Sequence, residues 1–275
     1  MMSTRRKILF LSILFIFMSN CSKYDVSPRH PWASFASGSW VNVHTYHRMI
    51  MKGEEPSIWE SDSRIVVMKV EEDRVTLRHH LPSLKIQEEA ILPVPAVDVF
   101  PGTRALGQWP HDIFPYGPER QEGVASEDKN PFPQQVTLKV LKETTDIFFQ
   151  GKKYPTKLYL KEWDVSTKTG KRHYVMKAWV TEGIELPLKW IITSSDGSDD
   201  SETELVNLED VVKVGKNQLT CMVTVTKKKL PEGVIVKKRW SSTQVPGFMV
   251  KMESWLEGQG FSLEVKEWIT GFFVK

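Results

Sequence analysis

The sequence has few of the residues on which chemistry depends. It contains two cysteines in 275 residues, Cys21 and Cys221, so several disulfides cannot hold the fold together. Nucleophile-elbow, phosphate-loop and His-Glu-x-x-His zinc motifs are all missing. The seven histidines are scattered, and the two-residue period of a strand places His44 and His47 on opposite faces. We therefore predict no catalytic residues, no metal site and no cofactor, and infer a protein that is not an enzyme.

Excess charge and long apolar runs are also scarce. Outside Ile8–Met18 no apolar run approaches the roughly 20 residues that span a bilayer. The formal net charge of +3 comes entirely from Arg5, Arg6 and Lys7, because the 37 basic residues less these three leave 34, against 34 acidic ones. The rest of the chain is neutral, which argues against the basic surface that nucleic-acid binding requires. We expect no nucleic-acid partner.

The amino-terminal residues predict export. The cationic start and the eleven-residue apolar run Ile8–Met18 are typical of a secretory signal. The segment Met18-Ser19-Asn20-Cys21 resembles the lipobox of bacterial lipoproteins, in which the cysteine thiol receives a diacylglycerol. The resemblance implies that residues 1–20 are a signal peptide and that Cys21 is the lipidated first residue of the mature protein. It also implies a membrane as partner through the lipid anchor, and Ser22 after the cysteine favours the outer membrane.

The distribution of prolines and the alternation of apolar and polar residues divide the remainder of the chain into four segments. Residues 21–36 carry Pro28 and Pro31 and are expected to form a short tether. Residues 37–92 contain three or four strand-like runs, with a hairpin turn at residues 71–73. Residues 93–134 lack periodicity. Residues 135–275 contain ten strand-like runs, 136–141 and 145–149 among them, and no comparable helical period.

Part of the last segment is repeated at a spacing of 61 residues. Val175-Met-Lys-Ala-Trp-Val returns as Val236-Lys-Lys-Arg-Trp-Ser, so that Trp179 and Trp240 occupy equivalent positions. Each copy is preceded by a Gly-Lys pair and followed by a proline, Pro187 or Pro246. A unit of about four antiparallel strands is a β-meander, and a large twisted sheet built from such units must curl. We predict an all-β fold: a curled antiparallel sheet, open or half-barrel-like, built from tandem β-meander repeats.

The second copy also carries a family resemblance. The segment Lys238-Arg-Trp-Ser-Ser-Thr-Gln-Val-Pro-Gly-Phe-Met-Val-Lys-Met-Glu-Ser is similar to uncharacterised envelope lipoproteins. More distantly, it resembles the half-open β-barrels of the periplasmic lipoprotein-carrier and outer-membrane receptor superfamily. In that superfamily the barrel encloses an apolar cavity for acyl chains.

Residues 93–134 hold eight of the sixteen prolines, and they are rich in aromatic residues, among them Trp109, Phe114 and Tyr116. Such a long irregular connection is usually functional or disordered, and its aromatic content argues against disorder. We expect Trp109–Tyr116 to dock on the sheet, either to shield an edge or to act as the lid of a cavity. In the second case Trp109, Phe114 and Tyr116 are candidate ligand contacts.

These observations lead to two expectations about function. The first is a lipid-anchored cell-envelope protein that binds an apolar or amphipathic ligand, or a protein partner. The second is a purely structural or assembly component of the outer membrane without a small ligand.

Overall fold

The computed structural model describes residues 30–93, 100, 103, 136–167, 170–198, 200–230, 233–258 and 260–275. Cys21 and the candidate contacts Trp109, Phe114 and Tyr116 lie outside these residues. The strands are β1 (Trp40–Met51), β2 (Ser57–Val70), β3 (Arg74–Leu81), β4 (Ile86–Pro93), β5 (Val136–Phe149), β6 (Lys152–Thr167), β7 (Gly170–Val180), β8 (Lys189–Ser194), β9 (Ser201–Val214), β10 (Asn217–Leu230), β11 (Gly233–Ser241), β12 (Met249–Gly258) and β13 (Phe261–Phe273). Two 3₁₀ turns, η1 (Pro31–Ser34) and η2 (Pro82–Leu84), complete the described elements.

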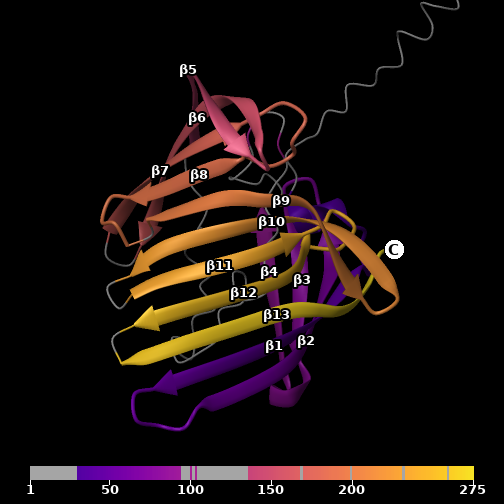
Figure 1. Ribbon diagram of the computed structural model, residues 1–275. Helices are drawn as coiled ribbons and strands as arrows, with labels where there is room; N and C mark the ends of the chain where they lie inside the picture. Colours follow the sequence, from indigo (N-terminus) through magenta and orange to yellow (C-terminus); the bar gives the residue numbers. More distant parts are fainter. Residues whose placement is uncertain are drawn as a thin grey trace, which may run out of the picture.

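All thirteen strands belong to one antiparallel sheet. Its order is β4-β3-β2-β1-β13-β12-β11-β10-β9-β8-β7-β6-β5, so β1 pairs with the last strand and β4 and β5 form the two edges. The sheet curls without closing into a barrel (Figure 1). The all-β, open and curled fold predicted from the sequence is thus confirmed. Among the described residues, no helix is long and apolar enough to cross a membrane.

The strands lie close to the runs that the alternation of apolar and polar residues predicts, but one prediction was wrong. The runs 136–141 and 145–149 are a single strand, β5, whose register with β6 shifts between Leu141 and Thr144. A bulge keeps a strand continuous while it breaks the two-residue alternation, which is why the sequence suggested two strands. The turn from β5 to β6 has positive φ at both Gln150 and Gly151, the geometry of a type I′ hairpin.

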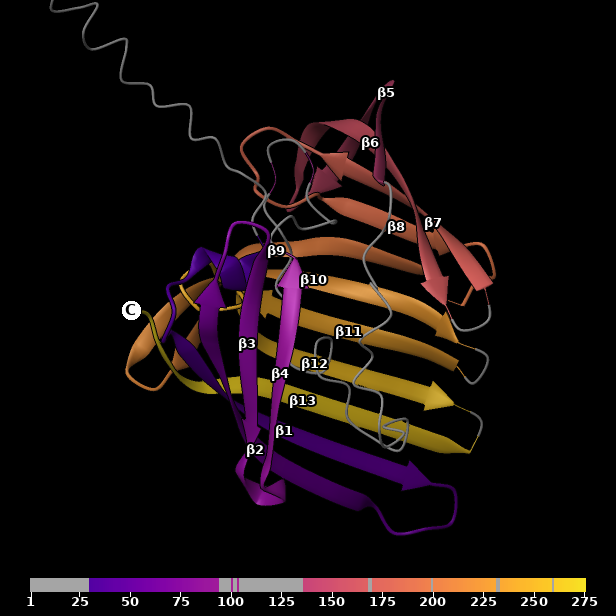
Figure 2. The same cartoon turned by 180° about the vertical axis from the view of Figure 1, so that it is seen from behind.

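One strand bends the sheet over itself. Ser57–Val66 of β2 pairs with β1, whereas Arg64–Val70 pairs with β3, so the two halves of β2 belong to different parts of the sheet. Figure 2 shows the consequence, because β3 and β4 cross in front of β10–β13. The side of β10–β13 that faces β3 is called the inner face here, and the opposite side the outer face.

The largest apolar core lies between these crossing layers. It brings Ile65, Val67, Val75 and Leu77 of β2 and β3 into one cluster with residues of β10–β13. Cys221 belongs to this cluster: it is fully buried, and its thiol donates to the carbonyl of Leu219 at 3.6 Å. The alternating apolar and polar run around Cys221 predicts a small buried hydrophobic residue, and its burial confirms that prediction.

The turn η1 closes this core at one end of the strands. Trp32 is buried and lies against Gly247 in the connection between β11 and β12. A Cβ atom on Gly247 would lie 2.5 Å from the indole, and the backbone there has φ of +77°, so only glycine fits. The chain therefore enters the described fold at the end of β12 where Met249 lies, opposite Gly258.

The two repeat copies occupy corresponding strands but differ in burial. Trp179 on β7 pairs with Lys189 on β8, and Trp240 on β11 pairs with Lys251 on β12. Trp240 is buried, its Nε1 donates to Asp210 Oδ2 at 2.7 Å, and its ring lies 4.6 Å from Lys251 Nζ. Trp179 is only half-buried. The equivalent positions of Trp179 and Trp240 in the repeat predict one shared structural role, but of the two only Trp240 is buried.

The acidic connection between β8 and β9 is an exposed hairpin tip with internal hydrogen bonds. The Asp196 carboxylate accepts from Ser198 Oγ at 2.8 Å, from the Ser198 amide at 3.1 Å and from Ser194 Oγ at 3.1 Å, and it pairs with Arg172 at 2.8 Å. The hydrogen bonds from the Ser198 side chain and amide lower the pKa of Asp196 to about 2. The oxygens of the Asp196 carboxylate are therefore occupied by hydrogen bonds within the turn.

We predict that Trp240→Ala lowers the free energy of unfolding by roughly 3–5 kcal/mol, because it removes a large buried side chain and the indole N–H that donates to Asp210 Oδ2. Urea denaturation followed by circular dichroism measures the change. Trp255→Ala is the control, since Trp255 is 40% exposed, and it should cost far less. Equal midpoints for the two variants would contradict the structural role of Trp240.

We also predict that Asp196→Asn destabilises the fold in a pH-dependent manner. The folded pKa of about 2 lies below the ordinary aspartate pKa of 3.8, so the ionised carboxylate stabilises the fold fully at pH values above 3.8. This stability is lost as the pH falls toward 2. The difference in urea midpoint between Asp196→Asn and the parent should therefore be largest near about pH 7 and shrink toward about pH 2. Val211→Thr, an exposed substitution that changes no ionisable group, is the control and should show no such convergence.

Candidate functional site

The inner face is a candidate binding surface because its apolar side chains are not all covered. Cross-strand partners share a face, and the register places Met49, Leu263, Leu256 and Ile235 in one row across β1, β13, β12 and β11. We call these four residues the inner apolar row. Met49 is 43% exposed, whereas Leu256 is buried. The row lies near the turns at residues 52–56 and 258–261, at the end of the strands opposite η1.

Toward the middle of the strands the inner face becomes polar. Four residues farther along the strands from the inner apolar row, the inner face carries a second row: Thr45, Glu267, Met252 and Arg239. Glu267 is 1% exposed and accepts a hydrogen bond from Thr45 Oγ1 at 3.5 Å. The inner face therefore changes from apolar at its open end to charged and buried farther inward.

A second apolar cluster lies on the inner face of β6–β8. It contains Tyr159, Met176 and Trp190, and Phe100 packs into it with 1% of its surface exposed. Phe100 donates its amide to Thr103 Oγ1 at 2.9 Å, and Lys161 Nζ lies 4.7 Å from the Phe100 ring centroid. Thus the irregular segment between β4 and β5 contacts the sheet at Phe100, while the predicted contacts at 109–116 remain a hypothesis.

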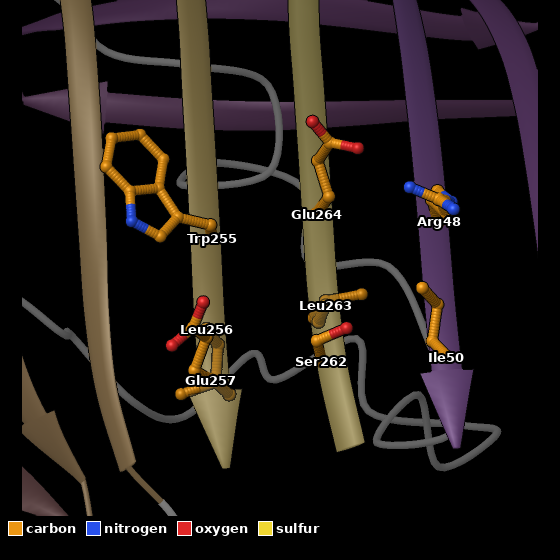
Figure 3. Close-up of a pocket in the computed structure, with 8 residues that line it drawn as sticks. All are labelled: Arg48, Ile50, Trp255, Leu256, Glu257, Ser262, Leu263 and Glu264. Atoms are coloured by element: carbon orange, nitrogen blue, oxygen red, sulfur yellow. The ribbon is translucent and has the colours of Figure 1, made fainter. Parts of the chain in front are cut away.

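The outer face of the same open end holds a hollow of about 290 Å³. It is formed on β1, β12 and β13, and Figure 3 shows its residues in two successive levels across these strands. Trp255, Glu264 and Arg48 form one level, and Glu257, Ser262 and Ile50 form the next. The full lining is Arg48, Ile50, Trp255, Leu256, Glu257, Ser262, Leu263 and Glu264.

The electrostatics of this hollow are set by paired and unpaired charges. Glu264 accepts from Lys266 Nζ at 2.7 Å, and this hydrogen bond raises the pKa of Lys266. No described residue forms an ion pair with Arg48 or Glu257. The Trp255 indole, likewise, has no aromatic neighbour among the residues that the structure describes.

The histidines behave as strand periodicity predicts. His44 pairs with Trp268 on the outer face and His47 with Val265 on the inner face. Each packs on a tryptophan, with ring centroids 4.6 Å apart in both the His44–Trp268 and the His47–Trp59 pairs. Within the described ranges, no three His, Cys, Asp or Glu residues come together in a way that could hold a metal ion.

The sequence analysis missed both the inner apolar row and the outer hollow. Each brings β1 beside β13, whose paired residues lie more than 200 positions later, so no local sequence pattern indicates either site. One signal was available for Trp255. Alternation in β12 places it opposite the buried Met252 and Leu256, on the solvent side, where a large aromatic residue has no packing role.

Comparisons with known proteins do not show a family for this chain. No family model matches the sequence, and no curated protein matches it. Among solved structures, a LolA superfamily protein of Nitrosomonas europaea is 10% identical, with a TM-score of 0.34 over 91% of this chain and 93% of the other. A putative outer-membrane lipoprotein-sorting domain from Vibrio parahaemolyticus is 12% identical, with a TM-score of 0.28 over 86% of each chain. Both TM-scores are below 0.5, and both identities are below 25%.

Proposed function

We propose that this protein is a non-enzymatic, lipid-anchored protein of the cell envelope that binds an apolar or amphipathic ligand on the inner face of its sheet. The observation that carries the proposal is the inner apolar row at the open end. Soluble proteins normally bury such a row in a core, and apolar surface that stays accessible usually marks a binding site. Here the row ends in Met49, which is 43% exposed.

The curvature of the sheet supports this role. Because β3 and β4 cross only part of the inner face, the core they cover and the apolar row at the open end share one surface. A ligand on the row would contact side chains from four neighbouring strands without displacing the core. The row therefore offers an extended apolar contact, which suits a flexible chain better than a compact ring.

The polar middle of the inner face favours an amphipathic ligand over a purely apolar one. Lys237 and Lys228 lie on the same face, on β11 and β10, next to Ile235 and its row. A polar end of a ligand can lie toward these basic groups while its apolar part lies on the row. Placing polar groups near water and partners avoids the cost of burying them unpaired.

Ligand binding on the inner face is tested with a fluorescent fatty acid added to delipidated protein. Met49→Asp/Ile235→Asp places two carboxylates in the apolar row, and we expect it to weaken binding by about tenfold or more, equivalent to about 1.4 kcal/mol. Val211→Asp is the matched control, because Val211 is 60% exposed on β9 outside the row, and its affinity should equal that of the parent.

Two results of this experiment would contradict the proposal. Equal loss in Met49→Asp/Ile235→Asp and Val211→Asp would show that the row is not the site. A parent that binds no fatty acid, and carries no lipid in native mass spectrometry, would favour a structural or assembly component.

Export and anchoring are a separate part of the proposal. The signal-like segment before Cys21 supports them, and the burial of Cys221 leaves Cys21 as the cysteine suited to modification. We expect mass spectrometry of the native amino-terminal peptide to find diacylglycerol on Cys21. Cys21→Ala should move the protein from the membrane to the soluble fraction, whereas Cys221→Ala should leave it membrane-bound. An unmodified Cys21 would contradict the anchor.

A further inference from the structure

The outer hollow has a chemistry different from that of the inner apolar row. One wall is the indole of Trp255, 40% exposed on β12. The other walls carry a guanidinium, two carboxylates and a hydroxyl, from Arg48, Glu257, Glu264 and Ser262. Figure 3 shows the indole extending away from Glu264 and Arg48, which lie on the next two strands. A flat apolar surface therefore lies beside both hydrogen-bond donors and acceptors.

This combination restricts the class of ligand. Glu257 and Glu264 oppose an anion, and Arg48 opposes a cation, so a neutral ligand is favoured. An acyl chain would leave the polar groups without partners, which costs free energy. A neutral ring with an apolar face of C–H groups and a rim of hydroxyls satisfies both requirements. Its face stacks on the indole, and its hydroxyls exchange hydrogen bonds with the surrounding side chains.

The size of the hollow agrees with a small ring. Its volume of about 290 Å³ is at the lower end of the range of roughly 300–1,000 Å³ for small-molecule sites. Strands on a rigid sheet hold the groups, with Glu264 fixed by its 2.7 Å contact with Lys266 Nζ. Arg48 and Glu257, which form no ion pair with any described residue, are available to a ligand.

The hollow and η1 lie at opposite ends of the strands. It lies at the Trp255–Gly258 end of β12, whereas η1 and the point where the chain enters the fold lie near Met249. Six residues of strand separate Met249 from Trp255, which corresponds to about 20 Å.

We propose that the outer hollow at Trp255 is a carbohydrate-binding site that takes a short stretch of a neutral glycan. Trp255 is the stacking platform for one pyranose ring. Arg48 and Ser262 donate hydrogen bonds to hydroxyls of the adjoining ring, and Glu257 and Glu264 accept them. Leu256 and Leu263 also line the hollow, but Trp255 and the polar groups lie on the outer face, and the site does not depend on the function proposed for the inner apolar row.

The test uses the full chain and two probes, the β-1,4-linked trisaccharides of glucose and of N-acetylglucosamine. Titration calorimetry and saturation-transfer NMR should detect saturable binding of at least one probe. Trp255→Ala should weaken it by about tenfold or more, and Trp255→Phe, which keeps an aromatic face, should weaken it less. Arg48→Gln should also weaken binding without affecting the fold.

Trp59→Ala is the matched control. Trp59 is 41% exposed, as Trp255 is, but it pairs with His47 on the inner face. Its removal should leave trisaccharide affinity unchanged. The Met49→Asp/Ile235→Asp variant should likewise bind the trisaccharide as the parent does, so a failure of the inner site and a failure of the outer site are distinguishable.

Two outcomes would overturn the proposal. One is the absence of saturable binding of both probes at about 10 mM, well above the range of specific affinities. The other is equal affinity in Trp255→Ala and Trp59→Ala, which would mean that the sugar binds elsewhere.

Discussion

The antiparallel pairing of β1 with β13 joins the two halves of this protein, and the remaining architecture depends on it. All twelve residues of β1 find a partner on the last strand, with one register shift between Asn42 and Val43. Without this pairing, β1–β4 would form a small sheet with an uncovered apolar face. With it, β2 carries β3 and β4 across the inner face of β10–β13, and the main core forms between them.

An antiparallel sheet without helices must cover its own apolar face. Here β3 and β4 cover only part of the inner face of β10–β13, because each is eight residues long and crosses longer strands. The part of the inner face that β3 covers is core, and the inner apolar row lies beyond it, with Leu256 buried and Met49 43% exposed. On the outer side of the same end, Trp255 is 40% exposed, and no described strand packs over it. Both candidate sites are thus consequences of where the second layer ends.

The repeat shows how one local pattern gives different results in different surroundings. In both copies a tryptophan lies opposite a lysine of the next strand, and a proline-containing connection follows. The connection after β11 is fixed by the contact of Gly247 with Trp32, which comes from the amino-terminal segment. Trp240 is buried and hydrogen-bonded to Asp210, whereas Trp179 stays half-buried. The difference arises from tertiary neighbours rather than from the repeated residues.

The sequence by itself determined the all-β class, the places of most strands and the turns between them, because alternation and turn chemistry are local properties. It also determined that Cys221 would be a buried small residue, since it lies in an alternating apolar strand. The sequence did not predict that residues 136–149 form one strand, because the bulge that joins the two runs depends on the partner strand β6. Only the tertiary structure decided that β1 pairs with β13 and that β2 serves two layers. It alone could bring Met49 to Leu263 and Arg48 to Glu264, since such contacts join residues more than 200 positions apart and depend on the closure of the whole sheet.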